Sequence, residues 1–135
     1  MKCVMIIDPS LPLGLQVNTA AGLGVSLAGK VGGLVGNPVA DADSNVYQGI
    51  VNIPLPILSL SADELKKKCL EIAAKGDESL EVFIFSDVAQ RSLSYDDYER
   101  NMANTRFQDM SILGICLYGP DKSVNKLSGN LKMLR

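Results

Sequence analysis

The stretch KCVMIIDPSLPLGLQVNTAAGLGVSLAGK (residues 2–30) joins the two patterns that decide the fold. Residues 2–8 form a continuous apolar run that ends in Asp-Pro, which is typical of a strand that is buried on both faces and stopped by proline. Residues 13–30 repeat Ala, Leu and Val at helical spacing. The stretch therefore predicts a buried strand followed by a helix.

Three glycines, Gly22, Gly24 and Gly29, lie inside the predicted helix, where each costs roughly 1 kcal/mol. We expect them to let the helix backbone pack closely against a sheet or a neighbouring helix. A dinucleotide-binding fingerprint is the alternative, but its glycines belong at the strand-to-helix turn and have a different spacing. Gln16 and Asn18 also interrupt the segment too early for a membrane span.

Residues 38–50 (PVADADSNVYQGI) predict two short extended pieces around an Asp-Ser-Asn turn. The polar residues of 41–45 match the first ligand positions of a calcium loop, but Val46 and Asn52 stand where glycine and glutamate are required. We therefore interpret this segment as a turn.

Residues 49–60 (GIVNIPLPILSL) resemble a strand that carries Pro54 and Pro56. Proline has no N–H to donate to a neighbouring strand, so this strand is expected at an edge of the sheet.

Residues 61–76 predict a helix with Ser61 as N-cap, Glu64 completing a capping box and Gly76 as C-cap. The remaining segments continue the alternation with a buried strand at 80–87, a helix at 94–105 that starts at Ser94, and a long strand at 110–119. Alternation of strands and helices predicts an α/β fold. At 135 residues, we expect one domain over residues 1–135.

The charge of the chain is uneven. The formal net charge is −2, which gives no general attraction to phosphate backbones or anionic membranes. Four cationic residues and one aspartate give residues 121–135 a net charge of +3, which leaves −5 for residues 1–120. Neither nucleic acid nor a membrane is an expected partner, and an anion site is expected near the tail.

The chain has three cysteines, Cys3, Cys69 and Cys116, and no histidine. No Ser-His or Cys-His catalytic pair and no Cys/His metal cluster can therefore form. The cysteines lack C-x-x-C spacing, and we interpret them as structural thiols of a protein in the reducing cytoplasm. We expect no metal and no cofactor.

Four segments together carry a family resemblance: KCVMIIDPSLPLGLQVNTAAGLG, GIVNIPLPIL, FSDVAQR and GICLYGPDKSVNKLSGNL. They resemble the family called domain of unknown function 2000, which is regarded as sharing the type II peptidyl-tRNA hydrolase fold. The resemblance implies a three-layer sandwich with a four-stranded mixed sheet in the order 2-1-4-3 and helices on both faces. The strand with the prolines would then lie at an edge.

The resemblance carries little of the hydrolase chemistry. Leu13 and Leu15 stand where the hydrolase has substrate-holding lysines, and Gly22 stands at the position of its helix histidine. Its Asp-Ala-Gly-Arg-Thr stretch is partly echoed by DVAQR, so Asp87 carries over while Arg91 is displaced by one position. The resemblance implies that Asp87 is the surviving carboxylate.

Two aspartates, Asp8 and Asp87, close predicted buried strands, and strand ends of α/β sheets surround the crevice where ligands bind. If both face one cleft, their repulsion would raise one pKa and leave the other low, so that the pair could perform acid and base work. The structural alternative is that Asp8 caps the turn at Pro9 and Asp87 accepts backbone N–H bonds.

Asp87, Asn18 and Arg91 are expected to line one cleft that prefers anions. The other candidate ligand-binding residues are Asp8, Asn52, Gln90 and Lys126. Structural or solvated roles stay open for each of them, because buried amides need partners and surface cations form ion pairs.

Three functions follow in order of preference. The first is a small-ligand-binding or interaction module that lacks most hydrolase residues. The second is a hydrolase of a small ester or amide that uses Asp87, and the third is a peptidyl-tRNA hydrolase. The expected partners are a small anionic or amide-bearing ligand and, as a homodimer, a second copy of the chain.

Overall fold

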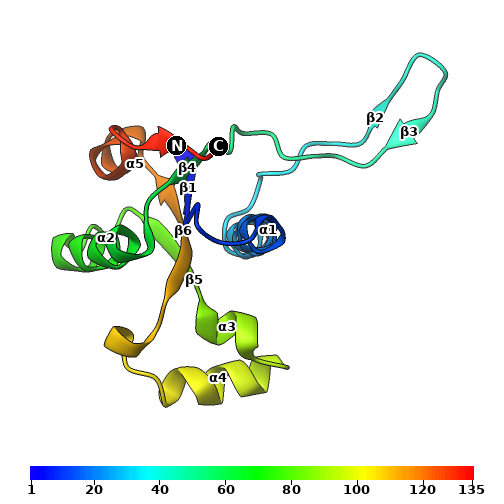
Figure 1. Cartoon of the computed structure of the whole chain (residues 1–135). Helices are drawn as coiled ribbons and strands as arrows, with labels where there is room; N and C mark the ends of the chain where they lie inside the picture. Colours follow the sequence, from blue (N-terminus) through cyan, green and yellow to red (C-terminus); the bar gives the residue numbers. More distant parts are fainter.

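The computed structural model describes all residues from 1 to 135 and contains one five-stranded sheet, one two-stranded sheet and helices (Figure 1). The elements are β1 (Lys2–Ile7), α1 (Leu13–Lys30), β2 (Val39–Ala40), β3 (Val46–Tyr47), β4 (Ile57–Ser59), α2 (Ala62–Lys75), β5 (Glu81–Ser86), α3 (Asp87–Arg91), α4 (Tyr95–Ala103), the 3-10 helix η1 (Phe107–Asp109), β6 (Ile112–Gly119), α5 (Asp121–Ser128) and β7 (Lys132–Met133).

The large sheet has the strand order β5-β6-β1-β4-β7. β1 runs parallel to β4 and antiparallel to β6, β5 is antiparallel to β6, and β7 is antiparallel to β4. The sheet is therefore mixed, and the prediction of four strands is wrong. The C-terminal segment turns back after α5 and adds β7, which pairs Met133 with Leu58 and Lys132 with Ser59.

The strand with the prolines is also shorter than predicted. β4 begins at Ile57, after Pro54 and Pro56, and it lies between β1 and β7 instead of at the edge. Pro56 still contributes to the sheet, because its carbonyl oxygen accepts a hydrogen bond of 3.0 Å from the backbone N–H of Met5. The prolines therefore precede the strand, where their missing N–H groups cost nothing.

Two apolar clusters lie on opposite faces of the sheet, and α1 and α2 lie on opposite sides of it (Figure 1). Alternate residues of β1 point to each side, with Val4 and Ile6 in the cluster that includes residues of α2 and α5, and Met5 and Ile7 in the cluster that includes residues of α1. Helices thus cover both faces. This explains why β1 is apolar at nearly every position, since both of its faces are buried.

Close contact between α1 and the sheet accounts for several small residues. A Cβ atom at Gly114 of β6 would come within 2.7 Å of the Thr19 methyl group of α1. At Gly22 a Cβ atom would lie 3.4 Å from the Phe85 ring, and at Gly24 it would lie 3.7 Å from the Met5 methyl group. Gly22 and Gly24 therefore face the sheet as predicted, but a small side chain at either position would make only ordinary van der Waals contact, so the close packing does not require glycine there. The prediction is wrong for Gly29, which has no such neighbour within 4 Å.

The predicted cap residues Ser61, Gly76 and Ser94 are in place, although the Glu64 side chain makes no hydrogen bond back to the Ser61 N–H. The Ser61 hydroxyl accepts a hydrogen bond from the Glu64 N–H, Gly76 ends α2 in the left-handed conformation, and the Ser94 hydroxyl accepts from the Asp97 N–H. β5 differs from its prediction as a buried strand, because most of its residues are only half-buried. It is an edge strand, so its flank lacks a neighbouring strand.

Residues 35–51 form a projecting hairpin, called the arm below, that extends away from the layered body (Figure 1). β2 and β3 pair only with each other. At the tip, Asp41 accepts hydrogen bonds from the backbone N–H groups of Asp43 and Asn45 and from the Tyr47 hydroxyl. The predicted turn between two short extended pieces is therefore confirmed.

Candidate functional site

Three strands of the large sheet end at one edge and lead directly into helices. β1 and β4 are parallel, and β5 runs in the same direction because β1 and β5 are both antiparallel to β6. The chain continues from these strands into α1, α2 and α3. Edges of this kind form the crevices in which open α/β sheets bind ligands.

Asp87 lies at this edge as the first residue of α3. Its backbone N–H donates to the Ser111 carbonyl oxygen at 3.0 Å, and its carboxylate oxygen Oδ1 accepts from the Ser111 N–H at 2.9 Å. The two bonds tie the end of β5 to the start of β6. Asp87 thus makes a backbone contact of the kind that a structural role requires.

Asp8 follows β1 and is almost fully buried. Its carboxylate oxygen Oδ1 accepts hydrogen bonds from the backbone N–H of Ser10 at 2.9 Å and from the Ser10 hydroxyl at 2.7 Å. These bonds give the buried carboxyl group hydrogen-bond partners and hold the turn that leads to α1.

The other candidate residues are spread over the molecule. Asn18 is exposed on α1, and Asn52 donates its side-chain amide to the Gly33 carbonyl oxygen at 3.0 Å, beside the arm. Gln90 and Arg91 are exposed on α3, where the Arg91 guanidinium lies 3.5 Å from the Thr105 hydroxyl.

Lys126 is exposed on α5 and contributes to a lowered pKa of the Asp77 carboxyl, although hydrogen bonds from Ser79 are the main cause. Asp87, Gln90 and Arg91 share α3, whereas the remaining candidates lie on other elements. The cleft that would join Asp87, Asn18 and Arg91 stays a prediction.

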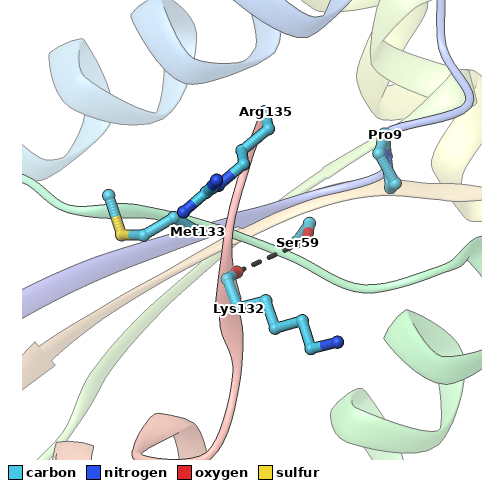
Figure 2. Close-up of a pocket in the computed structure, with 5 residues that line it drawn as sticks. All are labelled: Pro9, Ser59, Lys132, Met133 and Arg135. Atoms are coloured by element: carbon cyan, nitrogen blue, oxygen red, sulfur yellow. Dashed lines mark hydrogen bonds between the residues drawn. The ribbon is translucent and has the colours of Figure 1, made fainter.

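A cavity of about 590 Å³, called the tail cavity below, lies beside β4 and β7 at the same edge of the sheet. It is lined by Pro9, Ser59, Lys132, Met133 and Arg135 (Figure 2). The Ser59 hydroxyl donates to the Lys132 carbonyl oxygen at 3.4 Å, which adds a contact to the pairing of β4 with β7.

Two of the residues that line the tail cavity, Lys132 and Arg135, are cationic, and none is acidic. The side chains of Lys132 and Arg135 extend from the C-terminal strand and its end on different sides (Figure 2). Neither belongs to the four ion pairs of the chain, which involve Asp121, Glu71 and Asp97 as the acids. The uneven charge of the sequence predicted an anion site near the tail, but it did not single out Ser59, Lys132 or Arg135.

The model of the family described as "Protein of unknown function (DUF2000)" matches residues 1–135. The protein belongs to the DUF2000 family. No curated protein matches the sequence. One similar solved structure is that of a protein of unknown function from Agrobacterium tumefaciens strain C58, with 17% sequence identity and a TM-score of 0.85 over 98% of this chain and 96% of that one. This likeness shows a shared fold.

The cysteines of this DUF2000 protein are free and buried. The sulfur atoms of Cys3 and Cys116 lie 3.6 Å apart on neighbouring strands. Hydrogen bonding to Cys3, together with burial, raises the pKa of the Cys116 thiol, and burial raises the pKa of Cys69. Protonated thiols are poor nucleophiles, which fits the interpretation of Cys69 and Cys116 as packing residues.

Two further features of this DUF2000 protein concern metals and membranes. No group of three or more Cys, Asp or Glu side chains is placed to hold a metal ion. None of the helices combines the length and the apolar character that a membrane span requires.

Proposed function

We propose that this DUF2000 protein binds a small anionic ligand in the tail cavity. The observation that carries the proposal is the pair of cationic side chains, Lys132 and Arg135, which border one cavity without an acidic partner. Unpaired cations beside a cavity attract a carboxylate or a phosphate, because an anion there gains charge-assisted hydrogen bonds.

The three polar side chains of the cavity would have different roles. Arg135 can bind two oxygen atoms of a planar carboxylate or a phosphate at once, whereas Lys132 supplies a compact charge. The 3.4 Å bond of Ser59 to the Lys132 carbonyl oxygen is long for a hydroxyl donor. The Ser59 hydroxyl could therefore turn toward a ligand at little cost.

The proposal is for a binding module and does not extend to a hydrolase. Asp87 contacts Ser111 and is absent from the lining of the tail cavity. A peptidyl-tRNA hydrolase-like fold and hydrolysis with Asp87 stay predictions from the family resemblance.

The test is isothermal titration calorimetry with inorganic phosphate, acetate and citrate at low and at high ionic strength. Citrate is expected to bind most tightly, because it has several carboxylates, and its affinity should fall as salt screens the exposed cations. Lys132→Gln and Arg135→Gln should each weaken citrate binding by roughly tenfold or more, since one charge-assisted contact is lost.

Lys67→Gln is the matched control, because Lys67 is exposed on α2 and lies outside the cavity. It removes the same charge from the protein and should leave the affinity unchanged. An equal loss in Lys67→Gln, or no binding of any of the three anions by the unmodified protein, would contradict the proposal.

A further inference from the structure

The outer face of α1 carries a ridge of apolar side chains. Leu13, Val17 and Val25 are between 60% and 75% exposed, and with Ala21 they follow one another at intervals of four residues. Lys30 is the only charged residue of the helix. Helices on a protein surface normally turn charged residues outward, and helices with apolar residues on both sides are normally buried. The outer face of α1 therefore has the composition of a covered surface.

The arm is a second apolar element without cover. Val39, Val46, Tyr47 and Ile50 are between 53% and 78% exposed, and the arm projects away from the body of its own chain (Figure 1). A two-stranded hairpin is marginally stable in water unless another element packs against it. The arm is therefore also expected to lie against something.

Charge is depleted throughout this part of the chain. Between Pro9 and Leu60 the only charged residues are Lys30, Asp41 and Asp43, although the whole chain has 13 cationic and 15 anionic residues. Such depletion characterises the core of protein interfaces. The few charges also have complementary signs, since α1 has one cation and the tip of the arm has two anions.

We propose that two copies of this chain form a two-fold symmetric dimer in which the arm of each copy covers the outer face of α1 of the other. A second copy is the fitting partner because one chain presents both uncovered surfaces, and a two-fold interface pairs each surface with its complement twice. A groove of about 420 Å³ that includes Val17, Leu55 and Leu134 gives the side chains of the arm a place to insert.

The dimensions agree with this pairing. α1 has 18 residues, which gives a length of about 27 Å. The outgoing half of the arm, residues 35–43, spans roughly 30 Å if it is extended. The arm is therefore long enough to lie along or across the whole exposed ridge of a partner's helix.

The available apolar area also suits a stable dimer. Nine side chains on α1 and the arm are between 43% and 78% exposed, namely Leu13, Val17, Val25, Val35, Val39, Val46, Tyr47, Ile50 and Val51. At about 60 to 120 Å² of apolar surface for a whole side chain, they expose roughly 350 to 700 Å² in each copy. A standard interface buries about 800 Å² on each partner, of which about three fifths is apolar. The exposed apolar area of each copy therefore agrees with the apolar part of a standard interface, about 500 Å² on each partner.

The experiment is sedimentation equilibrium of the full chain. The unmodified protein is expected at twice the chain mass of 14.4 kDa. Val17→Glu on α1 and Ile50→Glu on the arm should each raise the dimer dissociation constant at least 100-fold, because each buries a charge in an apolar interface. Leu93→Glu is the control, since Leu93 is 94% exposed outside both surfaces and should leave the dimer intact.

A charge-swap pair tests which surfaces meet. Val17→Lys and Ile50→Glu chains should each be monomeric alone, and mixing them should give a heterodimer in which one lysine-bearing helix meets one glutamate-bearing arm. Circular dichroism confirms that each variant is folded, which is expected because both positions are exposed in the single chain. The proposal is overturned if the unmodified protein is monomeric, whether or not it binds phosphatidylcholine vesicles instead. It is also overturned if the dimer survives both glutamate variants, or if mixing the two charge-swap chains gives no heterodimer.

Discussion

The two faces of the large sheet are covered by helices whose outer, solvent-facing surfaces differ in polarity. On one face, α2 carries three consecutive lysines, of which Lys67 is exposed, and an ion pair of 3.0 Å between Lys68 and Glu71. On the other face, α1 has a single charged residue and exposes Leu13, Val17 and Val25. Both helices bury leucines against the same sheet. The two helices therefore differ in the polarity of their outer surfaces and not in their packing against the sheet. Core packing alone does not reveal which of the two outer surfaces is suited to contact with water.

The largest expected effect tests whether the two faces are equally well packed inside. Leu65 of α2 and Leu23 of α1 are both almost fully buried, in different clusters. Leu65→Ala and Leu23→Ala should each lower the free energy of unfolding by about 2 to 5 kcal/mol, because each leaves a cavity in a packed core. Urea denaturation at one protein concentration measures both losses.

Leu70→Ala is the control for this pair, because Leu70 lies on α2 and is mostly exposed. Its cost should stay below about 0.5 kcal/mol. If Leu23→Ala cost as little as Leu70→Ala, α1 would not be packed on the sheet as the structure describes, and the two faces would differ in their cores as well as their surfaces.

The same contrast explains which parts of the fold could be predicted from the sequence. α2 has local signals at both ends, namely Ser61 and Gly76, and the periodicity of residues 13–30 gave the bounds of α1. Local hydrogen bonds and hydrophobic spacing are visible in a sequence because they involve neighbouring residues. Both helices were therefore located correctly.

Features that depend on distant residues were missed. β7 has two residues, too few for a strand pattern, and it exists because Lys132 and Met133 meet Ser59 and Leu58 more than 70 positions earlier in the chain. The tail cavity depends on the same pairing. The charge of the tail indicated the chemistry of such a site, whereas its lining required the tertiary structure.

Asp87 shows the corresponding limit for single side chains. Its position at the end of a strand was predicted, but its partner Ser111 lies 24 residues further along the chain. Whether a carboxylate faces a cleft or a backbone N–H depends on the direction of its side chain, which a sequence pattern does not contain.

A smaller loss of stability is expected at the end of the edge strand β5, where Asp87 contacts Ser111. Asp87→Ala removes the acceptor of the Ser111 N–H and should lower the free energy of unfolding by about 1 kcal/mol, a value reduced by partial exposure to water. Asp87→Asn keeps an oxygen in the same place and should cost less than half as much. Urea denaturation of the two variants measures the difference.

The same pair of variants separates a structural Asp87 from a catalytic one. Asparagine preserves the contact with Ser111 but carries no charge that could act as a base. If the protein hydrolyses a simple ester such as p-nitrophenyl acetate at all, we expect Asp87→Asn to hydrolyse it at the same rate. Esterase activity that is present in the unmodified protein and lost in Asp87→Asn at unchanged stability would restore the hydrolase interpretation.

The smallest effect lies at the tip of the arm, on the side of the molecule where charge is scarce. Hydrogen bonding by the Tyr47 hydroxyl is the main reason why the pKa of the Asp41 carboxyl is lowered from 3.8 to about 2, and Asn45 contributes further bonds. A lowered pKa in the folded arm means that the charged form is favoured there. The stabilisation of the folded arm by the Asp41 carboxylate is therefore complete above pH 4 and is lost as the pH falls through about 2.

Tyr47→Phe should move the pKa of Asp41 back toward 3.8, which an NMR titration of the side-chain carboxyl measures. An unchanged pKa in Tyr47→Phe would mean that Asp41 is held by its bonds to Asn45 and to the Asp43 N–H without the tyrosine. The arm would then reach its partner with a less defined end than the dimer requires.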